Sequence, residues 1–116
     1  MKGNIYDKEL VKVAQIRAAT KKDLPAIAKL KLCIFKEAYW THLLVEDAEA
    51  QFLGHYQQLY HQEAAQHFLI EVAGEAVACA GAFLKDDMPF CFFQKPFYGF
   101  IGDVYTKPEH RKQGYA

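Results

Sequence analysis

The sequence of 116 residues lacks any run of about eighteen apolar residues, the length that a membrane-spanning helix requires. Its first twelve residues mix charged and apolar side chains, unlike the apolar core of a signal peptide. It also lacks a surplus of charge, because fourteen basic side chains balance fourteen acidic ones. Without a net positive charge or a basic groove, nucleic-acid binding is disfavoured. We therefore expect neither a membrane nor a nucleic-acid partner.

Cysteine is scarce, and its spacing forms no metal-binding or CxxC pattern. Cys33, Cys79 and Cys91 are odd in number and widely separated along the chain. Disulfide frameworks pair their cysteines, whereas buried free thiols are usual in reducing compartments. The pattern therefore indicates free thiols and a cytoplasmic location.

Histidines recur at six-residue intervals in the middle of the chain, at His55, His61 and His67. Two metal ligands on one helical face usually stand three or four residues apart. We interpret these histidines as surface or partly packed side chains, and we expect no metal site.

Hydrophobic residues make up 52% of the chain, enough for a core, and no repeat or linker divides it. Residues 11–18 alternate in a way that predicts a strand. Thr20 and Asp23 resemble a capping box, and Pro25 would fall in the first turn of the helix that follows. Apolar residues then recur every three or four positions, at Leu24, Ile27, Leu30, Ile34 and Ala38. The lysines of this segment are interpreted as a solvated face: Lys21, Lys22, Lys29, Lys31 and Lys36.

A second helix is predicted from about residue 46 to residue 66, because Phe52, Tyr56, Leu59 and Tyr60 keep helical spacing. Two apolar runs, residues 68–73 and 76–84, then predict a hairpin with Gly74-Glu75 as its two-residue loop, a pair suited to a type II′ turn. The second run is rich in small apolar residues, so we expect cover on both of its faces. The aromatic residues within 85–96 fit either a small satellite core or a substrate wall or subunit contact.

The last sixteen residues combine a strand with a basic turn. Residues 101–106 include four β-branched or aromatic residues, which predicts a strand, and Pro108 ends it. Residues 111–116 are a basic segment with a glycine at the fourth position. Main-chain N–H groups in such a turn converge on an anion, and a following helix N-terminus would add its dipole. This stretch therefore predicts a phosphate-binding turn.

In this context the chain resembles the GNAT superfamily of acyl-CoA-dependent N-acetyltransferases. Residues 16–27 resemble the superfamily's first strand and helix, and residues 104–116 resemble its acetyl-CoA signature. That signature reads Q/R-x-x-G-x-G/A, and Arg111, Gly114 and Ala116 satisfy it. The resemblance implies an α/β (α+β) fold, with a mixed, mostly antiparallel sheet of about four strands and two N-terminal helices. This is the front half of the GNAT fold.

The resemblance implies transfer of an acetyl group from acetyl-CoA, as co-substrate, to a primary amine of a small molecule. Asp103 is the candidate residue for contacting or deprotonating the amine, although it could instead bond the neighbouring backbone. Tyr39, Trp40 and Tyr56 could line the acceptor pocket, and Gly102 is compatible with a bulge where two strands part. The implied cofactor-binding residues are Val104, Tyr105, Thr106, Arg111, Lys112, Gln113, Gly114, Tyr115 and Ala116.

The resemblance covers only the first half to two-thirds of a typical family domain, so we expect residues 1–116 to be a truncated domain without its C-terminal helices and strands. The strand ending at Thr106 would then be an edge, with apolar surface exposed beside it. We expect a homo-oligomer formed through that edge or through the aromatic loop. Two functions stay open: an N-acetyltransferase of which this is an incomplete fragment, or a non-catalytic remnant that serves as a binding or oligomerisation module.

Overall fold

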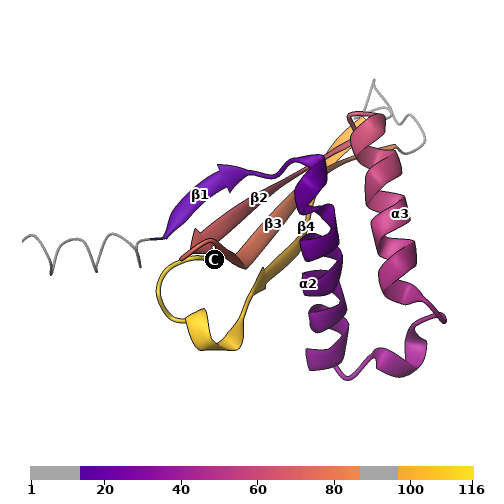
Figure 1. The fold of residues 1–116 in the computed structure, drawn as a ribbon. Coiled ribbons are helices and arrows are strands. Elements are labelled where there is room, and N and C mark those ends of the chain that lie inside the picture. The colour runs from indigo at the N-terminus through magenta and orange to yellow at the C-terminus, as the bar shows by residue number, and fades with distance from the viewer. Residues whose placement is uncertain (1–13, 87–96) are drawn as a thin grey trace, which may run out of the picture.

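The structure, a computed structural model, describes residues 14–86 and 97–116. It contains two long helices and four strands, with short 3-10 turns between them (Figure 1). The elements are β1 (Gln15–Ala18), η1 (Lys21–Asp23), α2 (Leu24–Glu37), η2 (Thr41–Leu43), α3 (Ala48–His61), β2 (Ala65–Val72), β3 (Glu75–Asp86), β4 (Phe97–Thr106) and η3 (Pro108–His110). The expected fold class, with two N-terminal helices and a four-stranded sheet, is confirmed.

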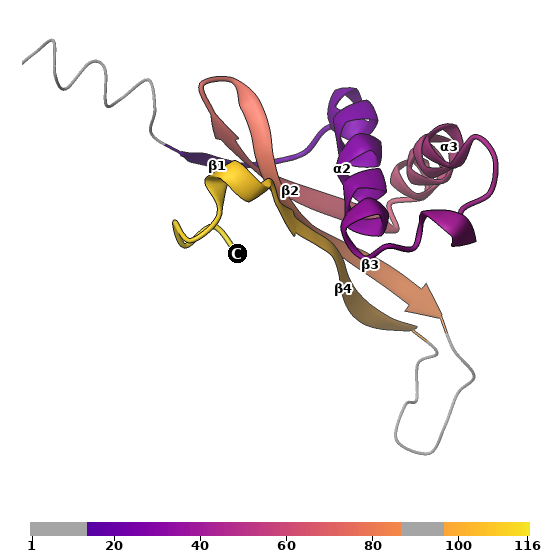
Figure 2. The same ribbon diagram turned by 90° about the horizontal axis from the view of Figure 1, so that it is seen from below.

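The four strands form one sheet in the order β1-β2-β3-β4, and every neighbouring pair is antiparallel. Both long helices lie on the same side of this sheet, as the view from below shows (Figure 2). The main core lies between them and the sheet, where Leu24, Ile27 and Leu30 of α2 pack with Leu69 and Tyr105. The helical stripe read from the sequence therefore faces the core.

The start of α2 is fixed by charged groups before it. The Thr20 amide donates to the Asp23 carboxylate at 2.7 Å, which satisfies one of the orphan N–H groups at a helix start. Arg17 of β1 binds both Asp23 and Glu71, at 2.7 Å from its Nη2 to Asp23. The hydrogen bonds from Arg17 lower the pKa of Asp23 to about 2. The first strand and helix are thus joined by an ion-pair cluster.

The second helix and the hairpin differ from their predicted limits. α3 ends at His61, five residues earlier than expected, because Glu63 has φ 56° and the chain turns into β2 at Ala65. In the hairpin, Val72 pairs with Glu75, so the loop residues are Ala73 and Gly74. Both have positive φ, 53° and 79°, which is a type I′ geometry rather than the expected type II′.

A bulge interrupts the ladder between β3 and β4. Cys79 is opposite Tyr105 and Gly81 is opposite Gly102, so Asp103 and Val104 together stand opposite a single residue. Asp103 takes φ 53°, in the left-handed region that non-glycine residues rarely adopt. The bulge lies next to Gly102, where the sequence was compatible with one. It directs the Asp103 side chain toward the helices.

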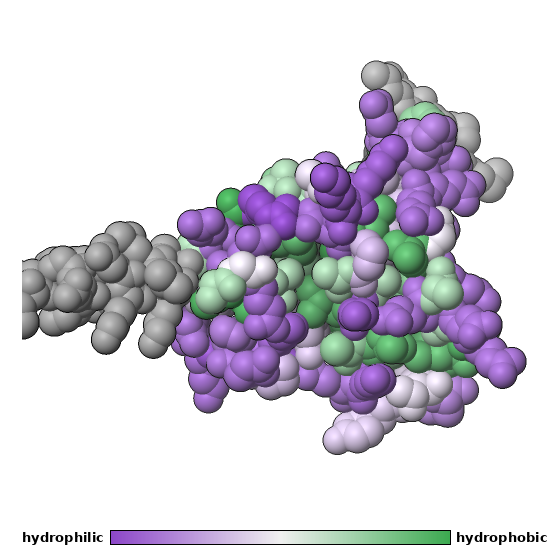
Figure 3. Space-filling model, in the orientation of Figure 1, coloured by the Kyte–Doolittle hydropathy of each residue, from purple (hydrophilic) through white to green (hydrophobic). Residues whose placement is uncertain are grey.

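The other side of the sheet carries none of the described helices (Figure 2). The expected cover on both faces of β3 is found only in its first half, where Val77, Ala78 and Cys79 are all buried and Tyr115 rather than a helix packs on this side, whereas Leu84 further along is 53% exposed. Apolar side chains stay exposed there, with Ile16 74%, Ile101 68% and Val104 54% accessible to solvent. On the helix side, apolar residues reach the surface only as separate patches among hydrophilic ones (Figure 3). Most of the predicted aromatic loop, residues 87–96, lies outside the described residues. No helix in the described part of the chain is long and apolar enough to cross a membrane.

We predict that Ala73→Asn stabilises the domain. Asparagine tolerates the left-handed backbone and favours type I′ turns, whereas alanine pays a steric penalty there, so the free energy of unfolding should rise by about 1 kcal/mol. Thermal denaturation should show a melting temperature several degrees higher. Ala73→Val is the control and should lower it. No gain for Ala73→Asn would instead favour the loop Gly74-Glu75.

Candidate functional site

The carboxylate of Asp103 lies where β2, β4 and both long helices meet. Its side chain is only 4% exposed. Lys31 of α2 donates to Oδ1 at 2.6 Å. Tyr56 of α3 donates to Oδ2 at 2.7 Å, and His67 Nε2 lies 2.8 Å from the same oxygen. Both carboxylate oxygens are thus occupied by groups from three other elements.

These contacts keep Asp103 ionised. Burial alone would raise its pKa, but the hydrogen bonds from His67, Lys31 and Tyr56 outweigh burial and lower the pKa to about 2. Burial, followed by the Asp103 charge, raises the pKa of Tyr56 far above its ordinary value. The same two causes raise the pKa of Cys79 to about 12. Asp103 is therefore a fixed negative charge, while Tyr56 and Cys79 stay protonated.

His67 supports this carboxylate from inside the protein and is fully buried. The Tyr60 hydroxyl accepts from the His67 amide at 2.7 Å, so its own proton is directed to His67 Nδ1 at 2.9 Å. That pattern assigns the imidazole proton to Nε2, which donates to Asp103. Gly81 makes room for the ring, because a Cβ there would stand 2.8 Å from it.

The histidine interpretation from sequence is thus wrong for His67, which is neither on the surface nor partly packed. It is a strand residue, one place beyond the range in which the sequence predicted a helix. The expected absence of a metal site is not contradicted by the described residues, where no three possible ligands gather.

A cavity of about 600 Å³, here called the aromatic cavity, opens in front of Asp103. α3 forms one wall, and the last part of β3 with the first part of β4 forms the other. Tyr56 lines it, as expected for the acceptor pocket, but Tyr39 and Trp40 do not and are 85% and 52% exposed. Its lining is Lys31, Val45, Gln51, Phe52, His55, Tyr56, Leu59, Phe83, Lys85, Phe100, Gly102 and Asp103.

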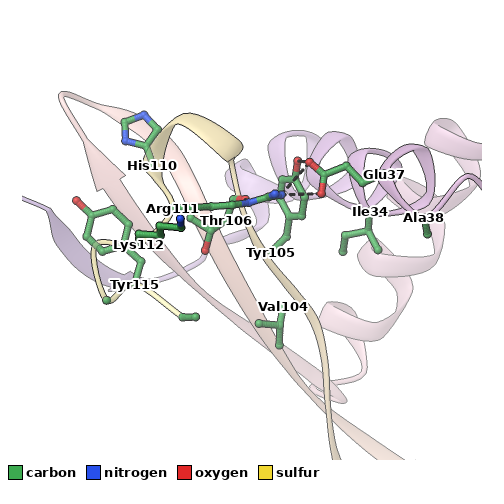
Figure 4. Close-up of a pocket in the computed structure, with 12 residues that line it drawn as sticks. Ile34, Glu37, Ala38, Val104, Tyr105, Thr106, His110, Arg111, Lys112 and Tyr115 are labelled. Carbon is green, nitrogen blue, oxygen red and sulfur yellow. Dashed lines mark hydrogen bonds and ion pairs between the residues drawn. The ribbon is translucent and has the colours of Figure 1, made fainter.

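A second cavity, of about 690 Å³, lies beyond the bulge and is here called the turn cavity. It is bounded by the end of α2, the end of β4 and the basic turn (Figure 4). Its lining is Ile34, Glu37, Ala38, Val104, Tyr105, Thr106, His110, Arg111, Lys112, Gly114, Tyr115 and Ala116. Eight of the nine residues predicted to bind the cofactor therefore surround one space, and Gln113 is not among its lining residues. Asp103 lines the aromatic cavity and Val104, the next residue, lines the turn cavity, so the two residues of the bulge border different cavities.

Arg111 joins the basic turn to α2. Its guanidinium forms two hydrogen bonds with the Glu37 carboxylate, at 2.8 and 2.6 Å, and its Nε donates to the Thr106 carbonyl at 2.9 Å (Figure 4). Tyr105 also donates to Glu37, and its ring lies 5.6 Å from the guanidinium carbon. The Arg111 contact lowers the pKa of Glu37. In this arrangement Arg111 anchors the turn.

The main chain of the turn is open to a ligand. Lys112 and Gly114 have φ 64° and 80°, so left-handed residues alternate with others, the backbone pattern of an anion nest. Within the described part of the chain, the N–H groups of residues 112–116 donate to no main-chain or side-chain acceptor. Tyr115 packs behind the turn against Ile70 and Ala78, which fixes its far end to the sheet.

Besides His67, two functional side chains were missed or misjudged from the sequence, Lys31 and Glu37. Lys31 was assigned to a solvated face, yet it binds Asp103 and is only 29% exposed in its side chain. Glu37 carried no signal, because a carboxylate at a helix end has no motif. The sequence contains one sign for Lys31. It stands one residue after Leu30 and four after Ile27, at the border of the apolar stripe, so its full exposure to solvent is open to question.

Comparison with known proteins agrees with the resemblance seen in the sequence. The sequence model of the acetyltransferase (GNAT) family matches residues 27–116. A predicted acetyltransferase with acetyl-CoA from Clostridium acetobutylicum is similar in fold, with a TM-score of 0.75 at 19% identity over 89% of this chain and 66% of that one. A GCN5-related N-acetyltransferase from Ralstonia eutropha JMP134 gives a TM-score of 0.77 at 19% sequence identity, over 88% of this chain and 67% of that one.

An aminoglycoside acetyltransferase from an uncultured soil metagenomic sample, in complex with sisomicin, gives a TM-score of 0.59 at 18% identity over 87% of this chain and 60% of that one. The chain thus spans 60–67% of the length of these three structures. At such identities the likeness shows the fold. No curated protein sequence matches the chain.

We predict that Asp103→Asn destabilises the domain by about 3 kcal/mol at neutral pH, because it leaves the Lys31 charge and the buried donors without a carboxylate. Since the folded-state pKa of Asp103 is lowered to about 2, its contribution is complete above the unfolded value of 3.8 and is lost as the pH falls toward 2. Urea denaturation of both proteins should therefore show a gap that narrows below pH 4.

The matched control is Glu63→Gln, which removes an exposed carboxylate and should change stability by less than about 0.5 kcal/mol. An equal, small effect of both substitutions would contradict the placement of Asp103.

Proposed function

Since the chain belongs to the acetyltransferase (GNAT) family, we propose that it takes part in the transfer of an acetyl group from acetyl-CoA to a primary amine. The observation that carries this proposal is that the neighbouring bulge residues Asp103 and Val104 line two cavities, one beside a fixed carboxylate and the other beside a basic turn. Donor and acceptor bound on either side of β4 would bring their reacting groups together there.

The turn cavity suits the cofactor in size and chemistry. The open N–H groups of residues 112–116 would hold the pyrophosphate, and Lys112 would add positive charge. Val104, Tyr105 and Thr106 lie in β4 at the edge of the sheet, where main-chain groups can bind the pantetheine arm. When bound, acetyl-CoA supplies a thioester as the acetyl donor. Arg111 would hold the turn in place through Glu37 rather than contact the phosphates first.

At the acceptor side, we assign Asp103 a contact role in preference to deprotonation. A carboxylate with a pKa of about 2 and three donors is a weak base, so it accepts a proton from an amine poorly. It instead holds Lys31 and the Tyr56 hydroxyl at the floor of the aromatic cavity. These two groups would meet the acceptor: Lys31 keeps further N–H donors, and the Tyr56 hydroxyl, whose proton is donated to Asp103, can accept a hydrogen bond through its oxygen.

The first test is calorimetric titration of the chain with acetyl-CoA, which should bind. Gly114→Ala should weaken binding by about 5- to 30-fold, because a left-handed alanine costs roughly 1–2 kcal/mol. Gly54→Ala is the control, because this glycine lies in α3 with open space around it, and affinity should stay unchanged. Absence of acetyl-CoA binding at millimolar concentration would favour the alternative of a non-catalytic binding or oligomerisation module.

We also propose that the chain forms a homo-oligomer in which a second copy covers the edge of β4 and the adjoining apolar face. β4 ends the sheet, so its outer main-chain groups have no neighbouring strand among the described residues. Ile101 and Val104 on β4 are exposed beside that edge, with Phe68 and Ile16 on the same side. An aromatic-loop contact would involve residues outside those described.

The second test is light scattering at micromolar concentration, which should give more than the monomer mass. Ile101→Lys should shift the protein toward monomer, since it places a charge in the proposed contact. Leu43→Lys makes the same change at an equally exposed residue, 66% accessible, on the connection between the helices, and should leave the mass unchanged. A monomer of the unaltered chain would refute this proposal.

A further inference from the structure

The aromatic cavity has an unexpected charge balance for a space that receives an amine. Its described lining contains two lysines, Lys31 and Lys85, together with His55, and a single carboxylate, Asp103. A site for a cation with several charges requires carboxylates that are free to pair with it. The lining of the aromatic cavity provides lysines where such a site would need free carboxylates.

The one carboxylate is already saturated. Lys31 occupies one oxygen of Asp103, and Tyr56 and His67 share the other. A second cation could pair with Asp103 only by displacing Lys31, and two ammonium groups would then repel each other in a partly buried space. The cavity therefore disfavours ligands with added positive charge.

The remaining wall is apolar and aromatic. Phe83 and Phe100 lie at the ends of β3 and β4 with ring centroids 6.4 Å apart. The Lys85 ammonium stands 5.7 Å from one centroid and 5.4 Å from the other. Phe52 and Leu59 of α3 line the same cavity. A flat apolar body can pack against these rings while an anionic group on it reaches Lys85.

We propose that the acceptor for this site is a small amine with an aromatic or similarly apolar body and a carboxylate, rather than a polycation. This inference rests on the proposed function, because it names the substrate class of the same acetyl-transfer site. The surrounding positive charge disfavours the ammonium form of the acceptor, so it also helps to leave the amine neutral for attack. The ammonium proton is then given up to solvent on binding; in the transfer the amine nitrogen bonds the acetyl carbon, the thioester C–S bond breaks, and the proton lost from the nitrogen ends on the CoA thiolate.

Two acetylated products test the carboxylate without requiring turnover. N-acetylphenylalanine and N-acetylphenylalaninamide have the same body and no amine charge, and they differ only in the carboxylate. Their binding to the full chain is measured by NMR titration. We expect the carboxylate form to bind at least about tenfold more tightly, as one well-formed ion pair allows. In an acetylation assay, phenylalanine should be preferred over the polycation sisomicin.

Lysine variants show which side chain causes the tighter binding of the carboxylate product. Lys85→Gln should abolish the difference between the two products, whereas Lys85→Arg, which keeps the charge, should retain it. Lys29→Gln removes an exposed lysine of α2 that does not line the cavity and should change nothing.

Equal binding of the two products, a preference that survives Lys85→Gln, or selective acetylation of sisomicin would each overturn the inference. Acetyl-CoA titration of the same samples separates this failure from that of the proposed function. If acetyl-CoA binds and the carboxylate preference is absent, the acceptor class is wrong and acetyl transfer stands. If the preference is present without acetyl-CoA binding, the proposed function fails while the anion-binding cavity is retained.

Discussion

The buried carboxylate of Asp103 connects the fold to the site. It is reached by α2 through Lys31, by α3 through Tyr56 and by β2 through His67, so three elements converge on two oxygens of β4. A charge so deeply buried is tolerated because each oxygen is bonded, and removal of any partner leaves an unpaired group behind. The left-handed backbone at Asp103 is part of the same arrangement, because it turns this side chain inward.

The bulge has a second consequence, since it separates two spaces along one strand. The lining residues of β4 up to Asp103 belong to the aromatic cavity, and those from Val104 onward belong to the turn cavity. The Glu37–Arg111 ion pair fastens the far wall of the turn cavity to α2, the helix that also supplies Lys31. One helix therefore positions both a group facing the acceptor and the anchor of the basic turn. We attribute the relative placement of the two cavities to α2.

The sequence predicts local elements well where the signal is local. The stripe on α2, the hairpin and the strand before Pro108 all follow from spacing and turn residues. It failed at the loop of the hairpin, because Ala73 gives no sign that it adopts a left-handed backbone. It failed for His67 and Lys31 because their roles depend on Asp103, which lies 36 and 72 residues away in the chain. Contacts between residues so far apart in the chain leave no periodic pattern in the sequence.

The site also shows why the resemblance to a family leaves the acceptor open. The turn at residues 111–116 is described by a motif, since main-chain phosphate binding constrains glycine and small residues. The aromatic cavity is built from residues of four elements and a connection, with no fixed spacing. Its balance of charge emerges only when Lys31 is seen to neutralise Asp103. Substrate class is therefore a property of the assembled fold.

The most direct test of the central role of Asp103 is the tautomer of His67. Nitrogen NMR of the labelled chain distinguishes a protonated ring nitrogen from one with a free lone pair. The account predicts a proton on Nε2, held by Asp103, and a lone pair on Nδ1 that accepts from Tyr60. A proton on Nδ1 with a bare Nε2, or the averaged signals of an exposed histidine, would contradict it.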